Sequence, residues 1–188
     1  MESLIPAKPL APTVDLATAE RVDSRELAAV AAQTFPLACP PAMTAENIAV
    51  FVETNLSPAR FAEYLADPDR AILVAAQCRR IVGYAMLVRG VADDADVQRA
   101  VAIRPAAELS KMYVLPEHHG AGVAPALMER ALTIAQGWAA RCVWLGVNQK
   151  NTRAQRFYAK SGFGVSGTRS FQVGARREAD FVMVRELR

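Results

Sequence analysis

One stretch of the chain decides the fold, and it reads Glu108-Leu-Ser-Lys-Met-Tyr-Val-Leu-Pro-Glu-His-His-Gly-Ala-Gly-Val-Ala-Pro-Ala-Leu-Met128. A mostly buried strand is indicated by Leu109, Tyr113, Val114 and Leu115, and Pro116 ends that strand because proline cannot donate to a ladder. Gly120 and Gly122 then allow backbone conformations that a side chain would forbid. The stretch therefore predicts a strand, a tight glycine turn and the start of a helix.

The predicted helix begins directly after the glycine turn. Its apolar residues recur at helical spacing on one face, at Val123, Leu127, Ala131, Ile134 and Trp138. Pro125 is compatible with this helix, because the N–H groups of a first turn have no intrahelical partner. Those free N–H groups and the helix dipole favour a bound anion, and glycines let a phosphate approach the backbone. A glycine pair by itself would still favour a plain strand-to-helix connection.

Helices and strands alternate through the rest of the chain. Four further helices are predicted, each after a capping residue: Asp23 or Ser24, Thr44, Ser57 and Asn151. Apolar runs predict strands at residues 13–17, 71–76, 81–88, 141–147, 165–173 and 179–184. Residues 35–41 are interpreted as a proline-rich connection and residues 89–105 as an exposed loop. A hairpin together with strand–helix–strand order predicts an α/β fold with a mixed sheet.

Length and composition are typical of one globular domain. The 188 residues suit a single domain over 1–188, and the prolines of residues 1–12 suggest a loose N-terminal arm. A net charge of +3 without a Lys/Arg block argues against a nucleic-acid surface. No run approaches the roughly 20 apolar residues of a membrane span. Without a secretory leader, and with three cysteines in no metal pattern, we expect a cytoplasmic protein without a metal site.

The glycine turn resembles motif A of the GNAT family of N-acetyltransferases, whose signature is Gln/Arg-x-x-Gly-x-Gly/Ala after a strand. The chain reads His119-Gly-Ala-Gly-Val-Ala124, so Gly122 and Ala124 match. His119 departs from Gln or Arg, and Pro125 removes one N–H that family members often offer to phosphate. The strand end at 112–116 also matches. In that family this loop holds the pyrophosphate of acetyl-coenzyme A.

A second stretch, residues 147–163, resembles motif B of the same family. The typical order is present at Asn151, Ala154, Phe157, Tyr158, Gly162 and Phe163. This motif alone would be interpreted as an amphipathic helix with aromatic core residues. Two motifs in the right order and separation favour the family. With the hairpin, the resemblance reaches back to about residue 71, and nothing in the first 70 residues indicates a subfamily.

The resemblance implies both a fold and a reaction. The fold is an α/β, GNAT-like mixed sheet, largely antiparallel and flanked by helices, with the central strands splayed apart. The reaction moves an acetyl group from acetyl-coenzyme A to a primary amine by direct transfer in a ternary complex. The implied coenzyme contacts are Met112, Tyr113, Val114, His119, Gly120, Ala121, Gly122, Val123, Ala124, Asn151 and Tyr158.

Acetyl transfer needs a donor to the oxyanion and a proton donor to the leaving thiolate. The resemblance implies that the Val114 backbone N–H polarises the thioester carbonyl and that Tyr158 is the acid toward sulfur. A phenol has a pKa of about 10, so it is protonated at neutral pH and can donate. Val114 and Tyr158 are therefore the candidates for these two roles.

The identity of the general base is open, because Glu108 has two interpretations. Strand alternation predicts that Glu108 shares a face with Ser110, Met112 and Val114, where it could take the amine proton. A strand-edge carboxylate in a salt bridge is an equally good interpretation. Beside the glycine turn, we expect His119 to contact phosphate through a ring N–H, whereas His118 is typical of a surface histidine.

Two other functions compete with this reading. A GNAT-like module could bind or sense acyl-coenzyme A without turnover, although the retained Asn151 and Tyr158 argue against it. A nucleotide-phosphate enzyme of another α/β fold would need a Walker lysine or a longer glycine run, and position 125 is proline.

The resemblance implies an amine acceptor, either a small molecule or the amine of a peptide or lysine, and the sequence does not select among these. We expect residues 35–58 and 89–105 to select it. Asp93, Asp94 and Asp96 could favour a cationic acceptor, although a solvated acidic loop is more typical. Dimer formation is common in the resembled family, which suggests a homodimer here.

Overall fold

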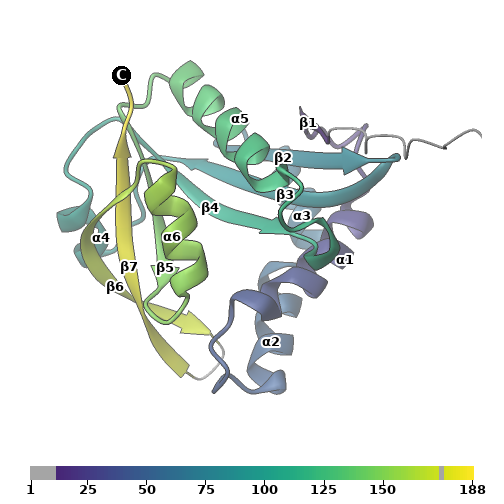
Figure 1. Cartoon of the computed structure of the whole chain (residues 1–188), viewed down its shortest axis with the longest axis horizontal. Helices are drawn as coiled ribbons and strands as arrows, with labels where there is room; N and C mark the ends of the chain where they lie inside the picture. Colours follow the sequence, from purple (N-terminus) through teal and green to yellow (C-terminus); the bar gives the residue numbers. More distant parts are fainter. Residues whose placement is uncertain (1–11, 174–175) are drawn as a thin grey trace, which may run out of the picture.

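The computed structural model of the protein describes residues 12–173 and 176–188 (Figure 1). The expected N-terminal arm, residues 1–12, lies outside the described residues except for Pro12. The described strands are β1 Thr13–Leu16, β2 Arg70–Gln77, β3 Arg80–Arg89, β4 Ala106–Val114, β5 Cys142–Asn148, β6 Gly164–Val173 and β7 Arg176–Glu186. The described helices are α1 Ser24–Ala38, α2 Ala45–Asn55, α3 Pro58–Ala66, α4 Ala95–Ala100, α5 Val123–Gly137 and α6 Thr152–Lys160, with a 3₁₀ turn η1 at Pro116–His118.

The strands form one mixed sheet in the order β1-β2-β3-β4-β5-β7-β6. Among the described strands, β4 and β5 are the parallel pair, joined by the crossover helix α5, and every other neighbouring pair is antiparallel. The parallel register covers three residue pairs, from Ala106↔Cys142 to Glu108↔Trp144. Beyond Glu108 the two strands separate. The predicted mixed, largely antiparallel sheet with splayed central strands is confirmed.

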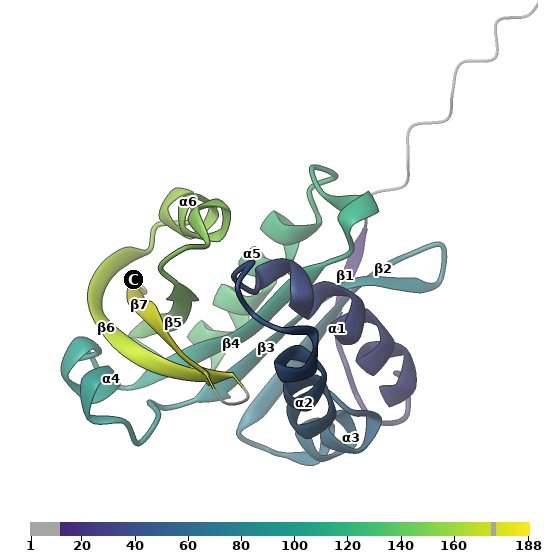
Figure 2. The same ribbon diagram turned by 90° about the horizontal axis from the view of Figure 1, so that it is seen from below.

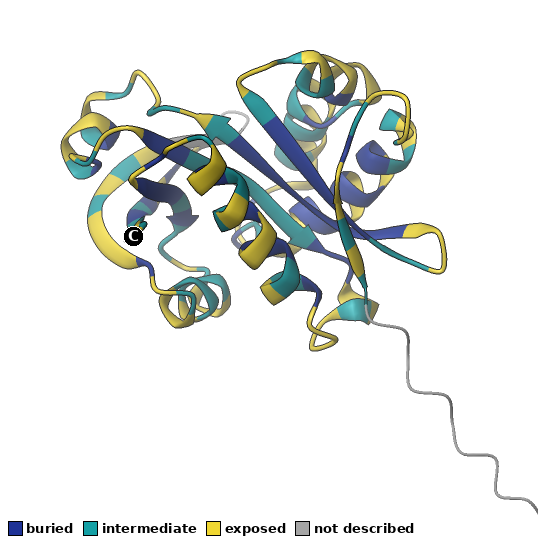
Figure 3. Ribbon diagram, turned by 90° about the horizontal axis from the view of Figure 1, so that it is seen from above, coloured by how far each residue is buried: buried dark blue, intermediate teal, exposed yellow. Residues whose placement is uncertain are grey.

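Helices cover both faces of the sheet (Figure 2). On one face α5 packs over β2, β3 and β4, and Leu73, Leu109 and Leu127 are fully or nearly fully buried there. On the opposite face α1 and α3 pack over β2 and β3, with Leu27 and Phe61 inaccessible. The outward sides of the helices are exposed, whereas the central strands are buried (Figure 3). No helix in the described part of the chain is long and apolar enough to cross a membrane.

Side-chain capping begins the helices that the sequence predicted. The capping side chains of Asp23, Thr44, Ser57 and Asn151 each accept a hydrogen bond from a backbone N–H of the first turn. Gly162, one residue past the Ser161 C-cap of α6, has a left-handed φ of 86°, as expected just after a helix end. These helix starts are therefore confirmed.

Two connections differ from expectation. Helix α1 continues through Pro36 to Ala38, although residues 35–41 were expected to be a connection. Pro36 cannot donate to the carbonyl four residues before it, and the helix ends two residues later. The neighbouring Phe35 is buried and stacks on Phe51 with ring centroids 4.3 Å apart, a contact that sequence periodicity does not show. Residues 89–105 are not a plain exposed loop either, because they contain α4, whose Val97 is inaccessible. Six residues are too few for a helical period to show in the sequence.

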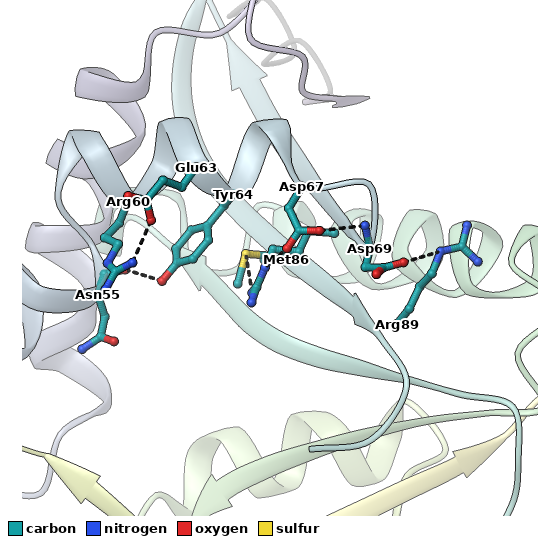
Figure 4. A network of polar contacts seen from close by, with 9 residues as sticks. Asn55, Arg60, Glu63, Tyr64, Asp67, Asp69, Met86 and Arg89 are labelled. Carbon is teal, nitrogen blue, oxygen red and sulfur yellow. Dashed lines mark hydrogen bonds and ion pairs between the residues drawn. The ribbon is translucent and has the colours of Figure 1, made fainter. Parts of the chain in front are cut away.

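Helix α3 is held to the neighbouring elements by a chain of polar contacts (Figure 4). The Tyr64 hydroxyl donates to the Asn55 carbonyl at 3.1 Å, and Asp67 accepts from the Asp69 N–H at 2.9 Å. Asp69 in turn lies 3.8 Å from the Arg89 guanidinium at the end of β3. Exposed ion pairs of this kind contribute little stability each, so they mainly fix the direction of α3.

Gly83 on β3 lets β4 approach closely at the end of the splayed region. A Cβ at this position would lie 2.9 Å from the Tyr113 carbonyl oxygen and 3.1 Å from a Val114 methyl. We expect Gly83→Ala to lower the free energy of unfolding by about 1–3 kcal/mol, because the backbone of β4 would have to shift. Chemical denaturation measures this. Gly137→Ala is the matched control, because a Cβ there meets nothing within 4 Å, and equal stability of the two variants would contradict the close approach.

Candidate active site

A cavity of about 690 Å³ lies where β4 and β5 separate. Residues 108–113 of β4 and 146–148 of β5 form two sides, and α6 adds Asn151, Ala154 and Tyr158. Residues of α1, α2 and their connection form an apolar wall that includes Phe35, Met43 and Phe51. Strands β6 and β7 add Arg169, Glu178 and Asp180. The cavity therefore joins the second sequence motif to the N-terminal helices and the last two strands.

A β-bulge in β4 sets which side chains face the cavity. The β3–β4 register steps from Leu87↔Leu109 to Met86↔Lys111, so Ser110 is the extra residue. The bulge keeps Glu108 and Lys111 on the face that α1–α3 cover, whereas Met112 and Val114 pack into the α5 side. The prediction that Glu108, Ser110, Met112 and Val114 share a face is wrong, because simple alternation fails at a bulge.

The backbone of β4 presents N–H groups to the splay. The Leu115 N–H donates to the Val82 carbonyl at 2.9 Å, and the Gly90 N–H donates to the Ala106 carbonyl at 2.8 Å. Hydrogen-bonded and non-hydrogen-bonded residue pairs alternate in an antiparallel ladder. These two bonds therefore fix which residues of β4 are hydrogen-bonded to β3. This pattern directs the N–H and C=O groups of Met112 and Val114 away from β3, toward the side where β5 has diverged.

The glycine turn lies just beyond this end of β4. Gly120 and Gly122 both have a φ of 81°, and a Cβ at either would meet nothing within 4 Å. The bond from the Ala126 N–H to the Gly122 carbonyl opens α5 at 3.2 Å. The N–H groups of Val123 and Ala124 precede it, and Pro125 has none. The turn thus has the open, left-handed backbone that the sequence predicted for an anion site.

His119 points back to the strand. Its Nε2 lies 2.8 Å from the Val114 carbonyl oxygen, so Nε2–H is the donor, because a carbonyl can only accept. The expected contact of a ring N–H with phosphate can therefore involve only Nδ1 while this bond holds. The bond ties the glycine turn to Val114.

Tyr158 projects from α6 into the cavity, which Asn151 and Ala154 of the same helix also line. Its ring packs on Phe163 with centroids 6.0 Å apart. Burial raises the pKa of the Tyr158 phenol to about 12. The hydroxyl is therefore protonated at neutral pH and can donate a hydrogen bond.

Two carboxyl groups in the cavity have raised pKa values. Burial raises the pKa of Glu108, although Arg169 and Lys111 oppose the shift. Among the described residues Glu108 makes no ion pair within 4.0 Å, so the structure does not show the strand-edge salt bridge. Burial also raises the pKa of Asp180 to about 6, against the pull of Arg169 at 3.5 Å.

Four charged residues of the cavity were missed in the sequence: Lys111, Arg169, Glu178 and Asp180. The strands at β6 and β7 were predicted. Charged residues within these two strands are the signal that could have identified Arg169, Glu178 and Asp180. Glu178 and Asp180 are spaced two apart, which places them on one face of β7, and both are buried. The Arg169 guanidinium lies over Gly146 of β5, in the space that a side chain there would occupy.

The two segments expected to select the acceptor have different positions. Segment 35–58 forms the apolar wall of the cavity, whereas segment 89–105 contributes no residue to it. Asp94 accepts from two N–H groups at the start of α4, and Asp96 pairs with Arg99. These aspartates therefore stabilise a short helix away from the cavity, and the expectation for residues 89–105 is not supported.

Comparison with known proteins places this geometry in a family. The model of the Acetyltransferase (GNAT) family matches residues 37–163, more than half of the chain. An uncharacterized N-acetyltransferase of Mycobacterium tuberculosis (strain ATCC 25618 / H37Rv) is 63% identical over 165 residues, which cover 88% of this chain and 98% of that protein. A peptidyl-lysine N-acetyltransferase of Salmonella typhimurium is 37% identical over 59 residues, covering 31% of this chain and 37% of that enzyme.

Solved structures share the fold. The PaiA N-acetyltransferase of Thermoplasma acidophilum, in complex with coenzyme A, superposes with a TM-score of 0.71 at 19% identity, covering 93% of this chain and 99% of that one. The family model that matches residues 37–163 and the 63% identity to the mycobacterial protein lead to one conclusion: the chain belongs to the GNAT family of N-acetyltransferases.

Proposed function

We propose that the protein transfers the acetyl group of acetyl-coenzyme A directly to a primary amine held in the cavity beside the splay. The observation that carries this proposal is the end of the parallel ladder at Glu108↔Trp144, which leaves the backbone of Met112 and Val114 facing an open cleft. The PaiA enzyme of the same fold binds coenzyme A. In this chain the pantetheine arm would run along β4 from the glycine turn past Val114. The thioester would then lie at Met112, which lines the cavity and is nearer to Glu108, whereas Val114 lies about 20 Å along the strand from Glu108.

The pyrophosphate of the coenzyme would bind at the glycine turn. Open space around Gly120 and Gly122 lets phosphate oxygens reach the backbone, and the start of α5 adds partial positive charge. The N–H groups of Val123 and Ala124 would donate to the phosphates. Pro125 cannot contribute, so the turn offers fewer donors than a typical family member.

The transfer step needs each of the three candidate groups. The amine nitrogen attacks the thioester carbonyl and the new C–N bond forms. The Met112 N–H, which points away from β3 as that of Val114 does, stabilises the negative charge on oxygen. The C–S bond then breaks, and the Tyr158 hydroxyl donates a hydrogen bond to the leaving thiolate. The amine proton passes to Glu108, directly or through water. The phenol is a stable donor because its raised pKa keeps the proton on oxygen.

We expect Gly122→Val to weaken acetyl-coenzyme A binding by about 10- to 100-fold, the loss of one charge-assisted backbone bond. Isothermal calorimetry on the folded variant measures it. Gly90→Val is the matched control, because Gly90 also has a left-handed φ and open space, but lies at the end of β3. Unchanged affinity of the Gly122 variant would exclude the glycine turn as the pyrophosphate site.

We expect Tyr158→Phe to lower kcat by about 10²- to 10⁴-fold with coenzyme affinity little changed, because the leaving thiolate loses its donor. Steady-state turnover with any accepted amine measures it, with thioester hydrolysis as the surrogate. Tyr84→Phe is the control, because its buried hydroxyl has no hydrogen-bond partner among the described residues. A Tyr158 variant that keeps the parent rate while chemistry limits would remove this residue from the mechanism.

We expect Glu108→Gln to lower kcat/KM by about 10²- to 10⁴-fold at neutral pH, as for loss of a general base. The base must be ionised, so activity of the parent should rise with pH through the raised pKa of Glu108. That limb of the pH–rate profile should vanish in the Gln variant, leaving only the limb of the acceptor amine. Glu129→Gln on the exposed side of α5 is the control. A pH profile identical to that of the parent would contradict the assignment.

A further inference from the structure

The floor of the cavity carries opposite charges on one face of the sheet. Glu108 pairs with Trp144 across β4 and β5, and Asp180 pairs with Asn148 across β5 and β7. Arg169 pairs with Asp180 across β6 and β7. Lys111 lies on the same face as Glu108 because of the bulge at Ser110. A ligand in this cavity would therefore meet carboxylates and cations together.

Resting on the acetyl transfer proposed above, we propose that the acceptor carries an anionic group beside its amine, as an α-amino acid does, and that Lys111 binds that anion. Lys111 would be a specificity-determining residue of the acceptor site. The amine would lie toward Glu108 and Asp180, and the body of the acceptor would contact the apolar wall.

The other cations near the floor already have anionic partners. The Arg70 guanidinium lies 2.8 Å from Asp67, and Arg169 lies 3.5 Å from Asp180. Among the described residues Lys111 forms no ion pair within 4.0 Å. Its ammonium lies 5.8 Å from the centroid of the Tyr64 ring, a contact that orients the side chain. Lys111 is thus available to an incoming anion.

The surroundings of Lys111 do not fully compensate its charge. Burial lowers the pKa of Lys111 to about 8; the attraction of Glu108 opposes that shift, and repulsion from Arg70 adds to it. Removing an ammonium from water disfavours its charged form unless an anion replaces the lost hydration. A carboxylate from the acceptor would supply that replacement.

The other residues that line the cavity indicate what kind of group connects the amine and the anion of the acceptor. Phe51, Met43 and Val50 line the opposite wall, and none of them carries a charge. An acceptor with an apolar body fits between this wall and the charged floor. A second ammonium placed at Lys111 would be repelled by it, so a polyamine cannot supply the group that this position favours.

Matched acceptors test the proposal directly. Leucine, phenylalanine and methionine are compared with isopentylamine, 2-phenylethylamine and 3-methylthiopropylamine, which lack only the carboxylate. Putrescine and a lysine-containing peptide complete the panel. Acetyl-coenzyme A consumption gives kcat and KM for the parent, Lys111→Met, Lys111→Arg and Lys160→Met. Lys160 is an exposed residue of α6 outside the cavity and serves as the control.

We expect the parent to favour at least one amino acid over its decarboxylated partner by about 10- to 100-fold in kcat/KM, the effect of one charge-assisted bond. Lys111→Met should remove the preference by raising KM for the amino acid alone. Lys111→Arg should retain part of it, and Lys160→Met all of it.

Three results would overturn the proposal. They are equal rates for the matched pairs, a preference for putrescine or the peptide, and thioester hydrolysis without transfer to any amino acid. Each of these leaves acetyl-coenzyme A use intact. By contrast, failure of the parent to bind or consume acetyl-coenzyme A would overturn the proposed function itself.

Discussion

The short parallel ladder between β4 and β5 is the constraint on which the rest of the site depends. Three residue pairs hold the two halves of the sheet together at one end, and the strands diverge beyond Glu108. If the ladder continued, the N–H groups of Met112 and Val114 would form hydrogen bonds with β5, and the cavity would close. Helix α5 makes this parallel pairing possible, because parallel neighbours need a crossover connection. The same helix places the glycine turn beside the end of β4.

The bulge at Ser110 determines which charged side chains of β4 share a face. Glu108 before the bulge and Lys111 after it both face α1–α3, whereas Leu109, Met112 and Val114 face α5. A regular strand could not give both the carboxylate and Lys111 to one face, because residues three apart alternate. One inserted residue therefore brings the Glu108 carboxylate and the Lys111 ammonium to the same face of the sheet. His119 ties the glycine turn to the end of this strand through its bond to Val114.

The sequence predicted those parts of the molecule that rest on local chemistry. Caps such as Thr44 and Asn151, the left-handed glycines and the strand end at Pro116 all follow from short-range rules. The bulge could not be predicted, because Leu109 and Val114 are apolar in either register. Arg169 and Asp180 could not be placed, because their approach to Glu108 depends on pairing between strands far apart in the chain. The short helix α4 was missed since six residues carry no helical period.

The absence of a side chain at Gly146 links the sheet to the acceptor site. The Arg169 guanidinium fills the space above this residue, lies 5.6 Å from the centroid of the Trp144 ring, and reaches Asp180 from there. Any larger residue at position 146 would displace the guanidinium and leave the Asp180 carboxylate without its partner. The size of the residue at position 146 thus determines how charge is placed in the cavity, although this glycine has no side chain to take part in the reaction. Redesign of the acceptor range could begin there, because enlarging this residue would change charge placement without altering any catalytic group.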